Sequence, residues 1–228
     1  MNKLGDVISD IYSDKAASYI GSLSAYRLVC IFFIGCFLGY IIETIYCYPK
    51  GGFQSRQAVL YGPFVPVYGF GGLLLTLALY KLQHMNVLLL FIISAVLGAS
   101  FEYIYSLLQE LMLGAITWDY SKAPFNLQGR TSLLYGVYWG VLGVLWIKLG
   151  YPLLSRFIER IPIVMRPYLT SILIVFMALN LILSALAIKR GGDRLQNIPP
   201  EGSFNRFLDS YYNDEYLARV FPYLKYIR

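Results

Sequence analysis

A chain of 228 residues that is 57% hydrophobic and only 14% charged cannot cover a water-facing surface, because soluble domains keep about a quarter of their residues charged. This composition excludes a soluble globular protein and predicts an all-α fold, a polytopic helical membrane protein. The net charge of +6 lies mostly at segment ends and in the tail. No basic run interleaved with aromatic residues is present, so we expect no binding to nucleic acid.

Residues 1–25 are predicted to form an interfacial amphipathic segment. Asp6, Asp10 and Asp14 recur at a spacing of four among apolar residues, which is typical of a short helix lying on the membrane surface. No basic stretch precedes a short apolar core and a small-residue cleavage site, so we expect no removable signal peptide.

Residues 26–189 are predicted to form the transmembrane helical domain, with about five membrane spans, since each span needs about 20 apolar residues. Lys and Arg residues divide equally between the two predicted faces, so the positive-inside rule does not set the orientation. The expected spans are Tyr26–Tyr48, Leu60–Leu82, Asn86–Leu113, Thr131–Leu154 and Tyr168–Ile188.

The second span has an irregular beginning. Its first residues, Tyr61–Gly72, read YGPFVPVYGFGG, and two prolines with four glycines cannot form a regular helix. Non-helical backbone at membrane depth persists only where protein or a wet cavity surrounds it. The segment is therefore either an interfacial loop or a broken, partly re-entrant entry to the helix.

Two acidic residues, Glu43 and Glu102, lie within otherwise apolar segments. Placing such a residue at the centre of a span costs about 2.5–3.5 kcal/mol, and it therefore usually faces a partner or water. Each glutamate either joins helices through an arginine or lines a path for a substrate or proton. In both cases we expect the partners to be Arg56 and Arg130.

The loop Trp118–Arg130, here called the motif loop, is unusually polar for a connection between spans. In one interpretation, Trp118 and Tyr120 anchor it at the interface while Asp119 and Asn126 cap turns. In the other, it forms the rim of a polar pocket with Arg56 and both glutamates. The planar guanidinium of arginine suits a carboxylate or phosphate, so such a pocket would bind an anion or a lipid head group.

Pairs of glycines four residues apart occur in the first and fourth predicted spans, at Gly35 and Gly39 and at Gly136 and Gly140. Small residues at this spacing let helix backbones approach closely, so we expect helix packing there. The same faces suit a homo-oligomer, although nothing in the sequence fixes one.

Several chemistries are disfavoured by missing motifs. The sequence contains no G-x-x-x-x-G-K-[ST], H-E-x-x-H or G-x-S-x-G. With a single histidine and three cysteines without C-x-x-C spacing, we expect no metal site and no cofactor. A non-enzymatic protein is expected, with carboxylate acid/base chemistry left open.

The ordered motifs GYIIETIY, RQAVLYGPFVPVYGFGG, FEYIYS and WDYSKAPFNLQGRTSLLYGVYWG resemble the CmpB-like type IV ABC-transporter permeases of bacteria, over residues 26–147. The resemblance implies a permease-type subunit in the bacterial cytoplasmic membrane. It marks as functional Glu43, Arg56, Tyr61, Gly62, Pro63, Tyr68, Gly69, Glu102, Trp118, Asp119, Tyr120, Asn126, Gly129 and Arg130.

Three functions follow as hypotheses. The first is a permease-type subunit that binds a small anionic or amphiphilic ligand and depends on a separate ATPase docked through residues 155–167. The second is an intramembrane enzyme acting on a lipid-like substrate, and the third is a membrane organiser or regulatory subunit. Membrane lipids are expected partners in all three. The expected ligand-binding residues are Glu43, Arg56, Tyr61, Tyr68, Glu102, Trp118, Asp119, Tyr120, Asn126 and Arg130.

Residues 190–228 are predicted to form a polar, aromatic C-terminal tail. The dense aromatic residues of FNRFLDSYYNDEYLARVFPYLKY indicate a short helix resting on the interface. We expect an appendage to the membrane domain and not a second domain.

Overall fold

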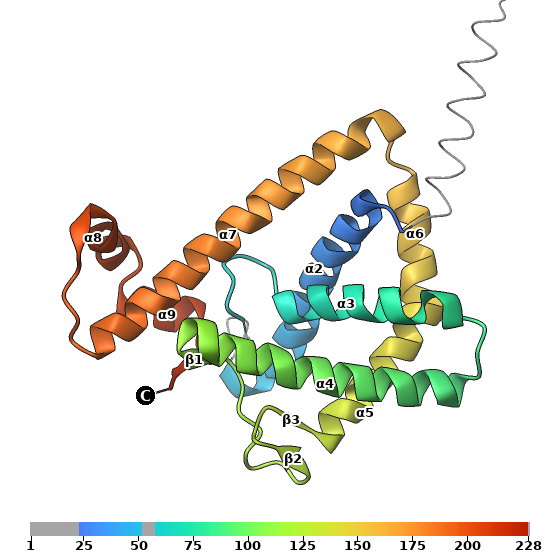
Figure 1. Ribbon diagram of the computed structural model, residues 1–228, viewed down its shortest axis with the longest axis horizontal. Coiled ribbons are helices and arrows are strands. Elements are labelled where there is room, and N and C mark those ends of the chain that lie inside the picture. Colours follow the sequence, from blue (N-terminus) through green and yellow to red (C-terminus); the bar gives the residue numbers. More distant parts are fainter. Residues whose placement is uncertain (1–22, 52–57, 228) are drawn as a thin grey trace, which may run out of the picture.

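The computed structural model describes residues 23–51 and 58–227 (Figure 1). The predicted interfacial segment, 1–25, lies almost entirely outside the described residues, and so does Arg56. Within the described part the fold is a bundle of long apolar helices with two small two-stranded sheets. This is a polytopic helical membrane protein.

Four helices in the described part are long and apolar enough to cross a membrane. The third of them is composite, because α5 continues through a π-helical turn into α6. The described part therefore has four long apolar helices, and the second of the five predicted spans, Leu60–Leu82, is a shorter apolar helix. The elements concerned are α2 Ala25–Gly51, α4 Val87–Leu113, α5 Leu133–Leu145, the π-helical turn Trp146–Gly150, α6 Tyr151–Glu159, the 3-10 turn Ile163–Met165 and α7 Arg166–Leu195.

The shorter helix, α3, runs over Pro66–Leu79 and ends in the 3-10 turn Tyr80–Leu82. At 1.5 Å per residue the two together are about 25 Å long, shorter than the roughly 30 Å hydrocarbon core. The chain preceding α3 is irregular, with a left-handed φ of 81° at Gly62, and the helix begins where a proline suits its first turn. The predicted break is therefore real, but it ends at Pro66.

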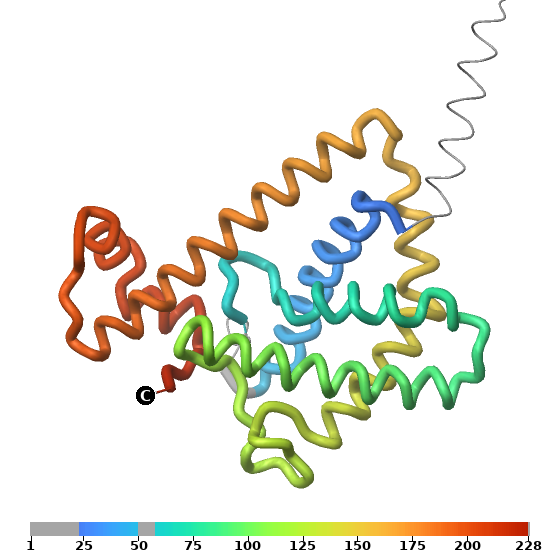
Figure 2. The backbone as a smooth tube through the Cα atoms, viewed as in Figure 1, coloured from blue at the N-terminus to red at the C-terminus, as the bar shows by residue number. Residues whose placement is uncertain are grey.

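Glycines within the helices allow neighbouring helices to pack closely. A Cβ atom on Gly69 would lie 2.4 Å from the sulfur of Cys36 in α2, and one on Gly39 would lie 2.5 Å from the side chain of Tyr68. Similarly, a Cβ on Gly140 would lie 2.6 Å from Phe91 in α4. The predicted glycine pairs thus serve helix contacts within the chain, between α2 and α3 and between α4 and α5 (Figure 2).

Helices α2 and α5–α6 run antiparallel. At one end, Tyr26 donates a hydrogen bond to the carbonyl oxygen of Ile158 over 2.9 Å, and Arg27 pairs with Glu159. At the other end, the hydroxyl groups of Tyr46 and Tyr135 lie 3.2 Å apart. The space between these helices is where the candidate site lies.

The motif loop is shaped by short strands. Strand β2 (Asn126–Leu127), inside the loop, pairs with β3 (Thr131–Ser132), which directly follows it. Strand β1 (Ala115–Ile116), directly after α4, pairs with the distant β4 (Lys225–Tyr226). The tail therefore reaches back to the base of the motif loop.

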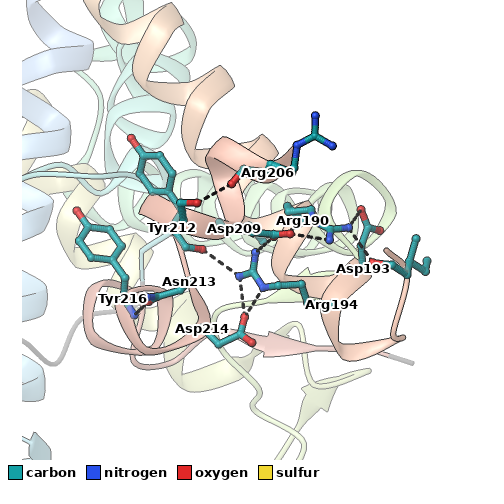
Figure 3. Close-up of polar contacts among 12 residues, drawn as sticks. Arg190, Asp193, Arg194, Arg206, Asp209, Tyr212, Asn213, Asp214 and Tyr216 are labelled. Atoms are coloured by element: carbon teal, nitrogen blue, oxygen red, sulfur yellow. Dashed lines mark hydrogen bonds and ion pairs between the residues drawn. The ribbon is translucent and has the colours of Figure 1, made fainter. Parts of the chain in front are cut away.

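The tail contains two helices, α8 (Gly202–Tyr211) and α9 (Asp214–Val220), which pack against the end of α7. Figure 3 shows the ion pairs that join them. The guanidinium group of Arg190 binds both carboxylate oxygens of Asp209 at 2.9 Å, and that of Arg194 lies 2.7 Å from Asp209 and 2.6 Å from Asp214. The sequence predicted one short helix here, and the structure contains two.

Candidate functional site

Glu43 is held by α2 and α3 together. Its side chain is buried, and one oxygen accepts a hydrogen bond of 3.0 Å from the hydroxyl of Tyr68. Its second oxygen lies 3.5 Å from the thiol of Cys47, one turn further along α2. Because Gly39 leaves room for the ring of Tyr68, the close approach of the two helices sets this carboxylate–phenol pair.

Glu102 is buried on α4 and is held by the motif loop. Tyr120 donates to one of its oxygens at 3.2 Å, and the hydroxyl of Thr131 donates to the other at 2.7 Å. Burial of a carboxylate is tolerated where hydroxyl donors satisfy its lone pairs. The prediction that an arginine is its partner is wrong for Arg130.

Arg130 instead pairs with Glu110 and donates to the hydroxyl of Ser106 over 3.3 Å. Glu102, Ser106 and Glu110 occupy successive turns on one face of α4, so all three are presented to the motif loop. Of these three, Arg130 forms its ion pair with Glu110, the one nearest the end of the helix, and its side chain is 16% exposed. Its guanidinium also lies 5.9 Å from the ring centre of Tyr103.

Asp119 and Asn126 make their hydrogen bonds inside the motif loop. The carboxylate of Asp119 accepts the backbone N–H of Ser121 at 2.9 Å, which lowers the pKa of Asp119. The amide of Asn126 accepts from the N–H of Gly129 at 2.9 Å and donates to the carbonyl of Ala123 at 2.8 Å. These two residues shape the turns that present the neighbouring rings.

A row of stacked rings connects α4, the motif loop and α5. Tyr105 stacks on Trp118 at 6.0 Å, Trp118 on Tyr120 at 6.5 Å, and Tyr120 on Tyr135 at 3.8 Å between ring centres. The indole N–H of Trp118 donates to the backbone oxygen of Arg130, which fixes its orientation. Burial raises the pKa of Tyr120 far above its ordinary value, so its hydroxyl stays protonated and able to donate.

These elements enclose a cavity of about 430 Å³ between α2, α3, α5 and the motif loop. Its lining combines the carboxylate of Glu43 with a group of rings that we name the aromatic cage. The predicted site residues that it brings together are Glu43, Tyr68, Trp118 and Tyr120, with Glu102 in contact through Tyr120. The aromatic cage consists of Tyr46, Tyr68, Trp118, Tyr120, Tyr135, Tyr138 and Trp139.

A second cavity of about 380 Å³ continues from the first between α2 and α5–α6. The two share four lining residues, and the second extends to Leu153 in α6 through side chains that are almost all apolar. We name this second cavity the apolar groove. The shared residues are Ile42, Tyr68, Trp139 and Leu142.

Tyr61 lies apart from this cavity. Its ring packs against Tyr212, Tyr216 and Phe221 of the tail, and its backbone oxygen accepts a 3.1 Å hydrogen bond from Asn180 of α7. Its place is at the junction between the irregular entry to α3 and the tail.

Sequence reasoning missed most of the aromatic cage. Tyr135, Tyr138 and Trp139 stand at positions i, i+3 and i+4 of α5, which places them on one helix face. Tyr46 follows Glu43 by three residues and shares its face of α2. The helical spacing of these rings relative to the glutamate is the signal that would have identified them.

Comparison with known protein families identifies a match over most of the membrane domain. A family model described as "Putative ABC-transporter type IV" matches residues 30–185, from α2 to most of α7, including the motif loop. No curated protein and no solved structure matches the chain. The family match covers well over half of the 228 residues and every described residue that lines the cavity. The chain therefore belongs to the ABC-transporter type IV (CmpB) family of membrane proteins.

Proposed function

We propose that this chain is the membrane-spanning, permease-type subunit of a transporter. In this proposal an amphiphilic ligand occupies the cavity between α2 and α5, and a separate ATPase supplies the energy. Family membership supports the transporter assignment. The sequence lacks the glycine-rich phosphate-binding motif of P-loop ATPases, so ATP hydrolysis is assigned to a partner.

The observation that carries the proposal is that the cavity holding the carboxyl group of Glu43 and the aromatic cage is continuous with the apolar groove. The 15 residues from Trp139 to Leu153 correspond to about 20 Å of helix, which exceeds the roughly 15 Å of hydrocarbon in one leaflet. A ligand with a polar head and one hydrocarbon chain fits this arrangement, with its head beside Glu43 and its chain along the groove.

The lining favours the amphiphilic ligand over the small anionic one. Among the described residues that line the cavity, the charged side chain is a carboxylate, which repels an anion. Arg130, which the sequence offered as an anion-binding group, pairs with Glu110. The proposed ligand is therefore an amphiphile without a net negative head group.

The exposed side chains at the rim of the cavity support entry of the ligand from the bilayer. Ile42, Tyr138 and Val141 line it and are each about 40% exposed on the side between α2 and α5. In a membrane these side chains face lipid, so an amphiphile is able to enter sideways, with its chain remaining in an apolar environment throughout.

The turn between α6 and α7 is the proposed docking point for the ATPase. Arg156 and Arg160 are exposed there beside the exposed side chains of Phe157 and Met165. The turn is held in place because Arg166 donates to the backbone oxygens of Ile161 and Glu159 at 3.1 and 3.0 Å. A fixed, basic and apolar projection suits a complementary surface on a partner.

Affinity purification in mild detergent followed by mass spectrometry tests the docking. We expect an ATPase to co-purify with the wild-type chain and to be lost from the charge-reversal variant Arg156→Glu/Arg160→Glu. The matched control, Arg206→Glu/Arg219→Glu, reverses two exposed arginines of the tail and should retain the ATPase. Equal recovery from both variants would contradict docking at this turn, and recovery of none from the wild type would contradict the permease assignment.

Lipid analysis of the same preparations tests the ligand. Leu142 lines both cavities, so Leu142→Trp should fill the junction and deplete a specific co-purifying amphiphile. Leu179→Trp, at a side chain that is 63% exposed on α7, is the control for added bulk. Identical lipid content in the two variants would exclude this cavity as the binding site.

The alternative of a carboxylate-dependent enzyme has weaker support. Glu102 is held by two hydroxyl groups and reaches the cavity through the ring of Tyr120. Such a position suits a structural carboxylate better than one that exchanges protons with a substrate. Retention of turnover by Glu102→Gln would exclude Glu102 as an essential acid or base.

A further inference from the structure

The aromatic cage is unusual in how its hydroxyl groups are used. Tyr68 and Tyr120 donate to the buried carboxylates of Glu43 and Glu102, and the hydroxyl of Tyr46 lies within hydrogen-bond distance of that of Tyr135. The phenol groups of Tyr46, Tyr68, Tyr120 and Tyr135 are thus engaged with the protein, and what the cage presents to the cavity is mainly ring surface.

Ring surface attracts one class of polar group. The faces of aromatic rings carry partial negative charge, so several rings around a small space form a site for an organic cation. Tyrosine and tryptophan are the aromatic residues that usually build such sites, and every ring of the cage is one of these two types. The carboxyl group of Glu43 lines the same cavity and adds electronegative oxygen atoms to it.

We propose that the cavity selects amphiphiles whose head group is an organic cation, such as a quaternary ammonium group. The head group sits within the aromatic cage beside Glu43, and the hydrocarbon chain lies in the apolar groove. The inference rests on the proposed function, because it names the ligand class of the same cavity.

Other head groups meet a less suitable lining. A phosphate or sulfate would lie against Glu43 with no lysine or arginine among the described lining residues. A sugar needs many free hydrogen-bond partners, whereas the hydroxyls of Tyr68 and Tyr120 already donate to carboxylates. A cation with methyl groups needs no hydrogen bonds and gains from both the rings and the carboxylate.

The experiment measures binding to the full chain in lipid nanodiscs by intrinsic fluorescence. All three tryptophans of the chain, Trp118, Trp139 and Trp146, line the cavity or the apolar groove, so their emission reports occupancy. The probes share a ten-carbon chain and differ in the head: decyltrimethylammonium, decyl maltoside and decyl sulfate. We expect the cation to bind at least about tenfold more tightly than the other two.

Variants of Tyr138, at the rim of the cavity, test the contributions of its ring and its hydroxyl to binding separately. Tyr138 is 45% exposed, so its replacement leaves the bundle intact. Tyr138→Leu should weaken the binding of decyltrimethylammonium about threefold, whereas Tyr138→Phe, which keeps the ring, should not. Tyr168→Leu, at a 69% exposed position on α7, is the matched control and should leave binding unchanged. Glu43→Gln should reduce the preference for the cation over the maltoside.

The outcomes distinguish this inference from the proposed function. Equal binding of cation and maltoside, or tighter binding of the sulfate, overturns the cation inference while leaving an amphiphile site in place. Binding of none of the three probes overturns both. A cation preference that survives Tyr138→Leu and Glu43→Gln unchanged also overturns the inference, because the selectivity would then arise elsewhere.

Discussion

One carboxylate is held where α7 meets the tail and another where the motif loop covers α4, but their partners differ, and Asp209 is 24% exposed whereas Glu102 is buried. Asp209 is bound by two arginines, Arg190 and Arg194, in a network of charge-assisted hydrogen bonds (Figure 3). Glu102 is bound by the hydroxyls of Tyr120 and Thr131. The first arrangement fixes helices by compensating charge, and the second holds a buried carboxyl group through neutral hydroxyl donors.

The difference distinguishes a structural contact from a candidate ligand site. We call the network of Arg190, Arg194 and Asp209 the anchor. A paired arginine and aspartate satisfy one another and offer little to a third group, which suits the attachment of α8 and α9 to α7. A carboxyl group held by neutral donors has no compensating charge in these contacts, and through Tyr120 it connects the motif loop, α4 and the adjacent cavity.

The largest effect is expected from Arg190→Met in the anchor. The side chain of Arg190 is 3% exposed and binds Asp209 through two nitrogens, so its loss should lower the local opening free energy of α8 and α9 by about 3 kcal/mol. Hydrogen exchange of the two helices measures this. Arg206→Met, at an exposed position on α8, should change it by less than about 0.5 kcal/mol. Unchanged protection in Arg190→Met would show that the anchor is not electrostatic.

The anchor should also respond to acid. Hydrogen bonds from Arg190 and Arg194 lower the pKa of Asp209 to about 2, below the roughly 3.9 of an unfolded aspartate. Because the folded pKa is depressed, the stabilisation is complete above about pH 4 and is lost as the pH falls toward 2. Exchange in α8 and α9 should increase over that window. Asp209→Asn should remove the pH step, and a step that persists in this variant would assign it to another group.

A smaller effect is expected at the contact that positions the site. A Cβ on Gly39 would lie 2.5 Å from the side chain of Tyr68, so Gly39→Ala should cost about 2 kcal/mol and disturb the bond from Tyr68 to Glu43. In Gly136→Ala the nearest atom, the Cβ of Ala99, is 3.7 Å away, and helix propensity should keep or slightly raise the stability. Thermal unfolding in detergent compares the two. Equal midpoints would contradict the close packing.

The smallest effect is expected for Glu102→Gln. The amide oxygen still accepts from Thr131 or Tyr120, so we expect less than about 1 kcal/mol of destabilisation. Glu102→Leu leaves both donors without an acceptor and should cost about 2 kcal/mol. If Glu102→Gln is as damaging as Glu102→Leu, the negative charge itself is structural and the contrast with the anchor fails.

Much of the fold was predictable because span length and apolarity are local properties. The ends of α4 match the predicted span within a residue at each end, since Asn86 caps the helix and Gly114 adopts the left-handed conformation that ends it. The predicted second span was too long, because the prolines delay the helix to Pro66. The glycines suggested a longer break, but their role depends on a neighbouring helix that local patterns do not contain.

The site was predictable only in part. A glutamate in a span indicates that a partner exists, but not which one, because Glu102, Ser106 and Glu110 all face the motif loop. Which of these residues contacts Arg130 depends on where the loop packs along α4, and this position is set by tertiary structure. The roles of Asp119, Asn126 and Arg130 as ligand contacts stay predictions, and the structure assigns hydrogen bonds or an ion pair within the fold to each of them.

The pairing of β1 with β4 bears on how the protein is made. Ala115 lies opposite Tyr226, and the N–H of Ile227 bonds the carbonyl of Gly114 at 2.9 Å. Ribosomes add about 5–20 residues per second, so the roughly 110 residues between these strands take on the order of 5–20 s to synthesise. Throughout that interval the base of the motif loop lacks its partner strand. The apolar helices, with every residue that lines the cavity, are thus synthesised before the strand that pairs with the base of the motif loop exists.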